Sequence, residues 1–294
     1  MTYGIRSFCL VVQIIFQMLF LGVISSSAET IAYYRFENGI PGSPASGVGT
    51  ILDSSGHGLN GTAINGPTYS SDVPTHIIPQ TGALNNLSLS FNGSDQRVYI
   101  PDNSLFKLTH SLTLEAYIKP FSDPTSKEQI VFRGDDRIGL DPYYLSLEPG
   151  GKAEFFIQNA KNQAAFITAA LPAIDQWSYI AGTLNGKTGV MDLYINGILS
   201  ASTTTNIRPL GELDKKYTPG IGIGNVQSGN YNEYFNGLID EVRISNEALN
   251  PSQFLDAKPV PEPRAMILEI SGFAIFFIIY RLSRNRRSAI VSIT

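Results

Sequence analysis

Two adjacent acidic residues, Asp240 and Glu241, lie at the head of the alternating apolar run in the segment FNGLIDEVRISNEALN, residues 235–250. Two carboxylates are the usual requirement for glycoside hydrolysis, and retention of configuration requires them to lie ~5–5.5 Å apart. Consecutive residues of a strand leave opposite faces, so we expect that this pair cannot act on one bond. Asp135 and Asp136 are also consecutive, and their sequence RGDD predicts a turn.

Other catalytic patterns are absent from the sequence. No strand carries alternating Glu-x-Asp-x-Glu, no Gly-x-Ser-x-Gly occurs, and His57, His76 and His110 are scattered. The single cysteine, Cys9, lies in an N-terminal apolar segment. The sequence therefore predicts a protein that is not an enzyme, with an unrecognised glycosidase as the remaining alternative.

The N-terminus has the pattern of an export signal. Arg6 precedes an apolar run over residues 8–24, and Ser26 and Ala28 fit the small-residue positions of a cleavage site. We expect residues 1–28 to be a signal peptide, with a retained membrane anchor as the alternative.

The C-terminus combines three features in order. Pro261, Glu262 and Pro263 lie in a linker over residues 257–264, an apolar segment follows over 265–280, and the basic tail 281–294 carries four arginines. The order resembles the PEP-CTERM sorting signal of Gram-negative bacteria. That resemblance implies recognition by an exosortase and handover to the cell envelope or the extracellular matrix. We expect a transmembrane segment with a cytoplasmic tail before processing, and a plain tail anchor is the alternative.

Charge and length limit what the remaining part binds and how it folds. Without residues 1–28 and 262–294 the chain keeps 15 Lys and Arg against 23 Asp and Glu, a net charge of −8. An acidic surface argues against nucleic acid and leaves neutral glycans or a divalent cation as partners. No linker or internal repeat divides the chain, so residues 29–256 are expected to form one domain without a disulfide.

Short strands and tight turns dominate this domain. Seven Asn-Gly pairs supply the positive φ angles that hairpins require. In SLTLEAYIK, residues 111–119, apolar residues alternate with polar ones, which places one face in the core and the other toward solvent or a groove. The pattern predicts an all-β fold, a two-sheet antiparallel jelly-roll sandwich, flanked by hydrophobic helices at both ends of the chain.

An ordered set of segments carries a resemblance to a known family. These segments are AYYRFENG, ILDSSGHGLNGTA, LSFNGSDQRVYIPD, SLTLEAYIKP, WSYIAGTLNGKTGVMDLYINGIL and FNGLIDEVRISNEAL. Together they resemble the LamG-like jelly roll of the concanavalin A-like lectin/glucanase superfamily over residues 31–255. The resemblance implies an extracellular binding or adhesion module.

The same resemblance implies one structural calcium ion. Asp240 matches the Asp of an Ile-Asp-x-Val strand that can bind calcium in related sandwiches, and the partner positions would be Glu37, or its carbonyl, and Asp53. The alternative is that Asp53 organises an Asx-turn and Asp240 accepts hydrogen bonds. Glu241 is expected to form a surface ion pair with Arg243 on the same strand face.

Exposed aromatic side chains would mark a glycan-binding groove, because they stack on sugar faces. The candidates are Tyr117, Tyr143, Tyr144 and Tyr231, with Arg133, Asp135 and Asn230 as polar neighbours. The alternative is that tyrosines in strands pack in the core. The sequence thus predicts an exported binding or adhesion protein for carbohydrate or a surface polymer. A structural envelope or matrix protein that makes protein–protein contacts is the alternative.

Overall fold

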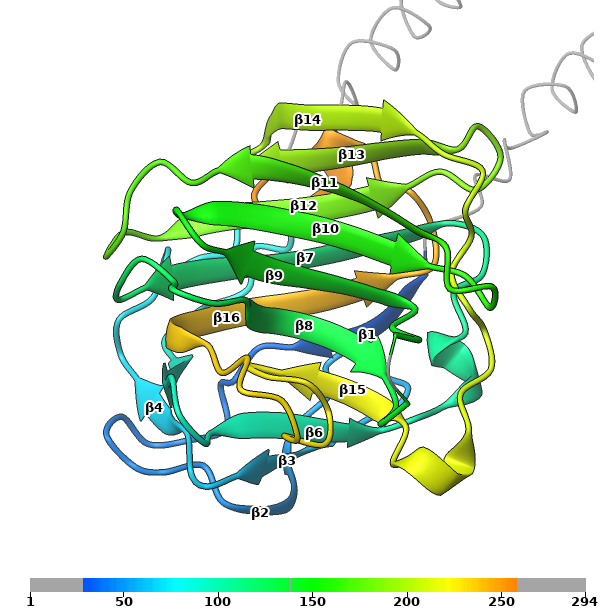
Figure 1. Cartoon of the computed structure of the whole chain (residues 1–294). Helices are drawn as coiled ribbons and strands as arrows, with labels where there is room; N and C mark the ends of the chain where they lie inside the picture. The colour runs from blue at the N-terminus through cyan, green and yellow to red at the C-terminus, as the bar shows by residue number, and fades with distance from the viewer. Residues whose placement is uncertain (1–28, 138, 258–294) are drawn as a thin grey trace, which may run out of the picture.

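The computed structural model describes residues 29–137 and 139–257, which form two antiparallel sheets packed face to face (Figure 1). The all-β sandwich predicted from the alternation is confirmed. The predicted signal peptide, the Pro261–Glu262–Pro263 motif, the transmembrane segment and the basic tail lie outside the described residues. Within those residues, no helix has the length and apolar character needed to span a membrane.

The first sheet, sheet A, has eight strands. In spatial order they are β14 (Ile198–Thr204), β13 (Val190–Ile195), β12 (Ser178–Leu184), β7 (Leu112–Pro120), β16 (Asn236–Ser245), β5 (Ser88–Asn92) and β4 (Thr68–Ser70), and β1 (Thr30–Tyr34) also pairs with β16. Residues 242–245 of β16 pair with β1 and residues 236–239 pair with β5, so one long strand holds both β1 and β5 in the sheet.

The second sheet, sheet B, also has eight strands. Their order is β11 (Ala164–Ala170), β10 (Lys152–Gln158), β9 (Tyr143–Glu148), β8 (Glu128–Gly134), β15 (Gly220–Ile223), β6 (Arg97–Pro101), β3 (Gly61–Ile64) and β2 (Gly47–Ile51). Three short 3₁₀ helices, η1 (Ser104–Phe106), η2 (Lys215–Tyr217) and η3 (Pro251–Gln253), complete the described elements.

The inner faces of the two sheets enclose the main hydrophobic core. On β7, Leu112, Leu114, Ala116 and Ile118 all belong to it, as the alternation of this segment predicts. The expectation that the other face of β7 meets solvent or a groove is wrong at Tyr117. Tyr117 on that face belongs to a second buried cluster that also contains Leu249, Phe254 and Leu255 of the C-terminal segment.

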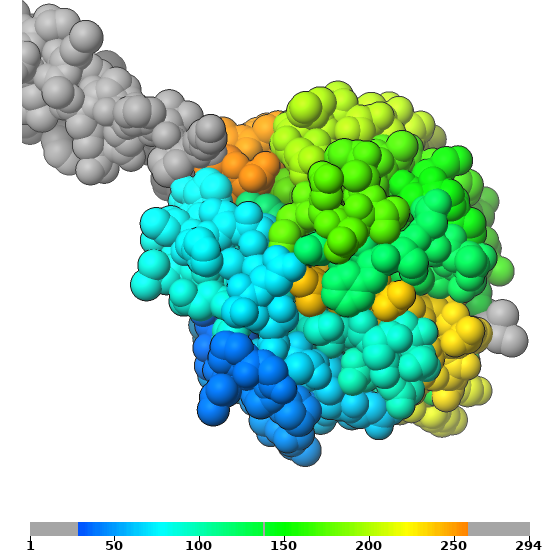
Figure 2. Space-filling view, turned by 90° about the vertical axis from the view of Figure 1, so that its left-hand side faces the viewer, coloured from blue at the N-terminus to red at the C-terminus, as the bar shows by residue number. Residues whose placement is uncertain are grey.

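This C-terminal segment, residues 246–257, covers the outer face of sheet A. In the space-filling view it lies between the cyan segment near residues 70–85 and the yellow-green β13–β14 region (Figure 2). The backbone N–H of Gln80 donates to the carbonyl of Leu255, and the ring of Phe254 lies 5.0 Å from that of Tyr194. The outer face of sheet A therefore carries a second packed layer, and buried polar side chains lie beneath that layer.

Candidate functional site

A bulge in β16 brings the adjacent acids together. Asp240 pairs with Tyr117 of β7, and Arg243 pairs with Glu115. Two residues of β16, 241 and 242, therefore lie opposite one residue of β7, 116. Glu241 adopts a left-handed conformation with φ 51°. A bulge places two successive residues on one side of the sheet. Asp240 and Glu241 thus share the outer face of sheet A, and the prediction that they leave opposite faces is wrong.

Glu241 is fully buried, contrary to the predicted surface ion pair. Its carboxylate accepts hydrogen bonds from the Tyr33 hydroxyl and, at 3.1 Å, from Nε of Arg35. Burial raises the pKa of Glu241 to about 7, although the Tyr33 hydrogen bond and the Arg35 charge act to lower it. The expected partner, Arg243, instead pairs with the buried carboxylate of Glu115 at 2.5 Å.

Asp240 is also fully buried. Its Oδ2 accepts from Nδ2 of Asn85 at 2.8 Å, and its Oδ1 accepts from the backbone N–H of Glu241 at 2.8 Å. Burial, followed by the neighbouring Glu241 charge, raises the pKa of Asp240 well above its usual range. Oδ1 of Asn85 is buried without a hydrogen-bond partner among the described residues. A buried carboxylate therefore lies beside a buried amide whose oxygen is unsatisfied.

The three side chains predicted to hold calcium do not form one cluster. The described residues contain no group of three or more His, Cys, Asp or Glu side chains placed to hold a metal. Asp53 accepts from the backbone N–H groups of Tyr33, Ser55 and Leu59 and from the Ser55 hydroxyl, at 2.8–3.0 Å. These bonds make the Asx-turn that was the alternative interpretation of Asp53.

Glu37 is similarly occupied. Its Oε1 accepts from the backbone N–H groups of Asn86 and Leu87 at 2.8 and 3.0 Å, and so anchors the loop that presents Asn85. Calcium prefers carboxylate and amide or carbonyl oxygens. Asp53 accepts two hydrogen bonds at each oxygen and Asp240 accepts one at each, so among the side chains described here Oδ1 of Asn85 is the oxygen left without a partner.

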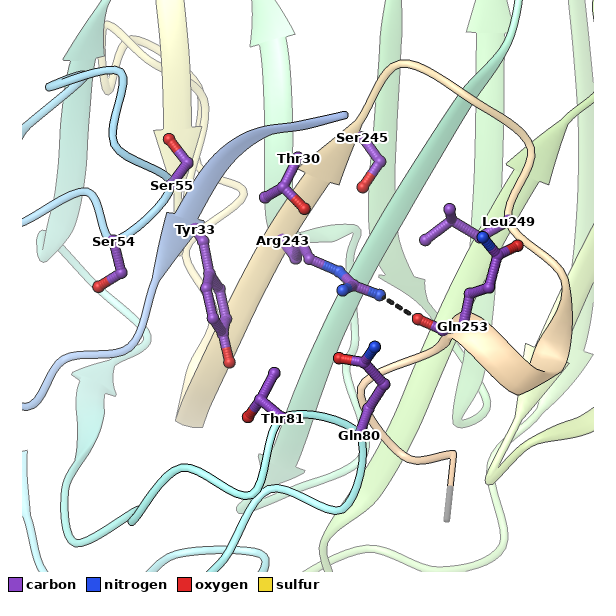
Figure 3. A pocket seen from close by; sticks show the side chains of 10 residues that line it. All are labelled: Thr30, Tyr33, Ser54, Ser55, Gln80, Thr81, Arg243, Ser245, Leu249 and Gln253. Atoms are coloured by element: carbon purple, nitrogen blue, oxygen red, sulfur yellow. Dashed lines mark hydrogen bonds between the residues drawn. The ribbon is translucent and has the colours of Figure 1, made fainter. Parts of the chain in front are cut away.

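A polar pocket of about 400 Å³ lies beside Tyr33 and Arg243, which are the partners of the buried carboxylates of Glu241 and Glu115 (Figure 3). Tyr33 of β1 and Arg243 of β16 stand in its wall, and Nη2 of Arg243 donates to the carbonyl of Gln253 at 2.7 Å. Hydroxyl and amide side chains make up most of the remaining lining. Thr30 of β1, Ser245 of β16, Gln253 of η3 and the loop residues Ser54, Ser55, Gln80 and Thr81 supply them, and Leu249 is the one apolar member.

This lining suits a neutral ligand rich in hydroxyl groups. The only charged side chain in it, Arg243, is already neutralised by Glu115. The acids behind the wall are inaccessible, since Asp240 and Glu241 have no exposed surface with which to contact a substrate. Gln80, Thr81 and Gln253 lie in irregular segments or a short 3₁₀ helix, where no sequence pattern distinguishes them. They were missed for that reason.

Most of the aromatic side chains predicted to bind a ligand are buried. Tyr143 is 0 % exposed and its hydroxyl donates to the carbonyl of Phe106 in the core. Tyr144, 5 % exposed, stacks on Phe156 at 4.4 Å. Tyr117 packs on Tyr179 beneath the C-terminal segment. These three are not ligand platforms, because the packing of each sheet face covers them.

The polar neighbours of those tyrosines have structural partners as well. Arg133 is completely buried and pairs with Asp102 at 3.0 Å. Asp135 pairs with Arg137 at 2.6 Å and accepts from the backbone N–H of Asp214. Of the predicted ligand residues, Tyr231, at 41 %, and its neighbour Asn230 are exposed, and neither lines the pocket in front of Tyr33 and Arg243.

Comparison with known proteins assigns the family. Residues 92–253 match the family model Laminin_G_3, described as the concanavalin A-like lectin/glucanases superfamily, and the chain belongs to this family. A search of curated proteins found no match.

Several solved structures share the fold. Domain 4 of AbnA, an extracellular GH43 arabinanase from Geobacillus stearothermophilus solved with arabinotriose, is 22 % identical, with a TM-score of 0.52 over 78 % of this chain and 98 % of that one. The binding domain of botulinum neurotoxin serotype G is 13 % identical, with a TM-score of 0.55 over 76 % of this chain. The serotype D domain solved with N-acetylneuraminic acid is 15 % identical, with a TM-score of 0.52 over 78 % of this chain.

The chain spans about half the length of these two neurotoxin binding domains, 49 % and 50 %. At such low identities the likeness shows a common fold and does not transfer a binding site.

Proposed function

We propose that this protein is a non-catalytic binding protein that holds a neutral carbohydrate or hydroxyl-rich surface polymer in the pocket between β1, β16 and η3. The observation that carries the proposal is the lining of that pocket by hydroxyl and amide groups, with its single cation neutralised by Glu115. Two structural neighbours were solved with arabinotriose and with N-acetylneuraminic acid, and these complexes support carbohydrate as the ligand class. The pocket therefore points to glycan recognition without hydrolysis.

The test is co-sedimentation of the protein with a panel of insoluble neutral polysaccharides. Gln80→Ala and Gln253→Ala each remove a hydrogen-bonding group of the lining, and each is expected to weaken retention about 3- to 10-fold, since one such bond contributes about 1 kcal/mol. Gln163→Ala, at an exposed site outside the pocket, is the matched control. Equal retention of all four proteins, or no retention by any polysaccharide, would sink the proposal.

Calcium is proposed as a structural ion at Asp240 and Asn85. Its charge would offset the buried carboxylate and satisfy the amide oxygen of Asn85, and so would hold the bulge that places Tyr33 and Arg243 beside the pocket. Added calcium is then expected to raise the melting temperature of metal-stripped protein. Asn85→Ala and Asp240→Asn should lose that rise, and Asp53→Asn should keep it. A rise that survives in Asp240→Asn would place the ion elsewhere.

Export and sorting remain proposals that rest on the sequence. The apolar N-terminal run and the Pro261–Glu262–Pro263 motif with its apolar and basic segments support passage to the cell envelope and handling by an exosortase-type enzyme. A tagged chain that reaches the envelope, and that loses its C-terminal tag only when Glu262 is intact, would support this route. Cytoplasmic retention would contradict it.

A further inference from the structure

A second pocket lies where β2, β4 and the loop before β2 meet. Residues of the loop 38–46 line it together with Thr50, Leu52 and Tyr69. Its volume is about 500 Å³, within the range of roughly 300–1,000 Å³ that is typical of small-ligand sites. In the space-filling view this loop belongs to the blue part of the surface, below the cyan segment near residues 70–85 (Figure 2).

The lining of this second pocket carries no charge. The whole segment from residue 38 to residue 52 contains no Asp, Glu, Lys, Arg or His, although the chain has a net charge of −4. A charged ligand would lose hydration on entering the pocket and would find no counter-charge there. The pocket therefore favours a neutral ligand.

The hydroxyl of Tyr69 is the most informative polar group of the lining. The residue is 5 % exposed, and its ring packs in the main core, where a Cβ on Gly39 would overlap it. The hydroxyl of the core residue Tyr143 donates to the carbonyl of Phe106, whereas that of Tyr69 forms no hydrogen bond with any described residue. It is not one of the fully enclosed atoms that lack a partner, so it opens on the pocket.

A polar group in this position takes its hydrogen-bond partner from whatever fills the pocket. Burial raises the pKa of Tyr69, so the hydroxyl keeps its proton and is able to donate. The side chains of Asn38 and Ser46, both exposed, also form no hydrogen bond with the described residues. Three polar groups of the lining are thus available to a ligand.

The same lining offers apolar contacts. Ile40 and Leu52 are 72 % and 41 % exposed. A sugar ring presents C–H groups on its faces and hydroxyl groups at its rim, so it can use apolar side chains and isolated hydrogen-bonding groups together. A purely apolar ligand would leave the three polar groups without partners.

We propose that this second pocket is a further binding site for a neutral saccharide, in which the Tyr69 hydroxyl donates to a sugar oxygen and Ile40 and Leu52 contact a sugar face. The inference rests on the proposed function for its ligand class. Leu52 lies two residues before Ser54, which lines the pocket between β1, β16 and η3, so the two pockets are neighbours along the chain. Two neighbouring sites allow a glycan polymer to be held at two points.

The test extends the co-sedimentation with insoluble neutral polysaccharides to this pocket. Tyr69→Phe removes only the hydroxyl, and it should leave the melting temperature unchanged because that hydroxyl forms no bond within the protein. The variant is measured in a Gln80→Ala, Gln253→Ala background, where the first pocket is weakened. There it should reduce retention a further 3- to 10-fold or so, as expected for one lost hydrogen bond.

Tyr143→Phe in the same background is the matched control. It removes a hydroxyl that donates within the core, so it should lower the melting temperature and keep retention. Retention that Tyr69→Phe leaves unchanged would overturn the inference. A loss of retention in Leu52→Ser but not in Tyr69→Phe would also overturn it, because the pocket would then make an apolar contact only.

The same measurements separate this site from the first pocket. A loss with Tyr69→Phe and none with Gln80→Ala or Gln253→Ala would support the second site and remove the first. The opposite pattern would keep the first pocket and overturn the second. No retention by any polysaccharide would overturn both.

Discussion

The outer faces of the two sheets are covered in different ways. On sheet A, two buried carboxylates have a cationic partner: Glu115 pairs with Arg243, and Glu241 pairs with Arg35 and also accepts from the Tyr33 hydroxyl. Asp240 on the same face accepts hydrogen bonds only from neutral groups. On sheet B, aromatic rings form the layer. Tyr144 stacks between Phe132 and Phe156, and Nζ of Lys127 lies 4.3 Å from its ring centre.

This difference predicts how substitutions and pH affect the stability that each face contributes. A buried charge is stable only while its partner is present, so the outer face of sheet A depends on a few pairs and on pH. Stacked rings do not titrate, and their contact depends on shape. Each substitution in the ring layer of sheet B should therefore lower the free energy of unfolding by a smaller amount. The pocket lies on the face with paired charges, where Tyr33 and Arg243 belong both to its wall and to the buried network.

The largest effect is expected from breaking one buried pair. Arg243→Met leaves the Glu115 carboxylate buried without its cation and should lower the free energy of unfolding by about 3–5 kcal/mol. Lys127→Met on sheet B is the matched change, because Lys127 bridges Glu148 and Glu154 while 25 % of its side chain remains exposed. It should cost about 1 kcal/mol or less. Urea denaturation measures both, and equal losses would contradict the contrast between the faces.

The next effect is a fall in stability as pH rises. The pKa of Glu241 is raised in the folded protein from 4.5 to about 7 by burial, so between these pH values the folded state keeps a proton that the unfolded chain has lost. The contribution of this group should therefore be complete below about pH 4.5 and be lost as the pH rises through 7, by on the order of 2–3 kcal/mol between pH 5 and 8.

Urea denaturation of metal-free protein between pH 5 and 8 measures this decline. Glu241→Gln should flatten it. Asp141→Asn, in the loop before β9, should flatten a further part, because burial also raises the pKa of Asp141 to about 7. A wild-type stability that rises from pH 5 to pH 8 would contradict the predicted direction of the pH dependence.

The smallest effect concerns the aromatic layer. Phe156→Leu removes the ring stacked on Tyr144 at 4.4 Å and 5°, and should cost about 1 kcal/mol, equally at pH 5 and pH 8. Phe166→Leu on the neighbouring β11 is the control, since its ring is 59 % exposed, and it should change stability little. A loss for Phe156→Leu that depends on pH would show that the two faces are less distinct than their contacts indicate.

The segments with clean alternation were predictable, and the end strands were harder to recognise. β12 coincides with the apolar segment SYIAGTL, and the inner face of β7 follows from its sequence. β11 and β14 are rich in alanine, serine and threonine and lack a clear alternation of apolar and polar residues. Their strand structure comes from hairpin pairing with β10 and β13, which the residues of β11 and β14 do not themselves reveal, although the Asn196–Gly197 turn before β14 predicts a hairpin there.

The site shows the same division. The Ile-Asp-x-Val segment predicts a candidate site, but the bulge at Glu241 is visible only in the pairing of β16 with β7. Sequence likewise marks tyrosines as candidate platforms, whereas burial of Tyr117 depends on the C-terminal segment that packs over it. Fractional exposure is a property of the assembled layers, so the sequence alone could not distinguish a ligand platform from a core residue.

The sequence by itself determined the class of fold, because alternation with period two and Asn-Gly turns specify strands and hairpins locally. It also determined the acidic charge that disfavours nucleic acid as a partner. Only the tertiary structure decided that Asp240 and Glu241 share a face, that Glu115 and not Glu241 pairs with Arg243, and that residues of β1 and β16 build the pocket together with loop residues. Each of these depends on strand register and on segments far apart in the chain, and local residue pattern carries no information about either.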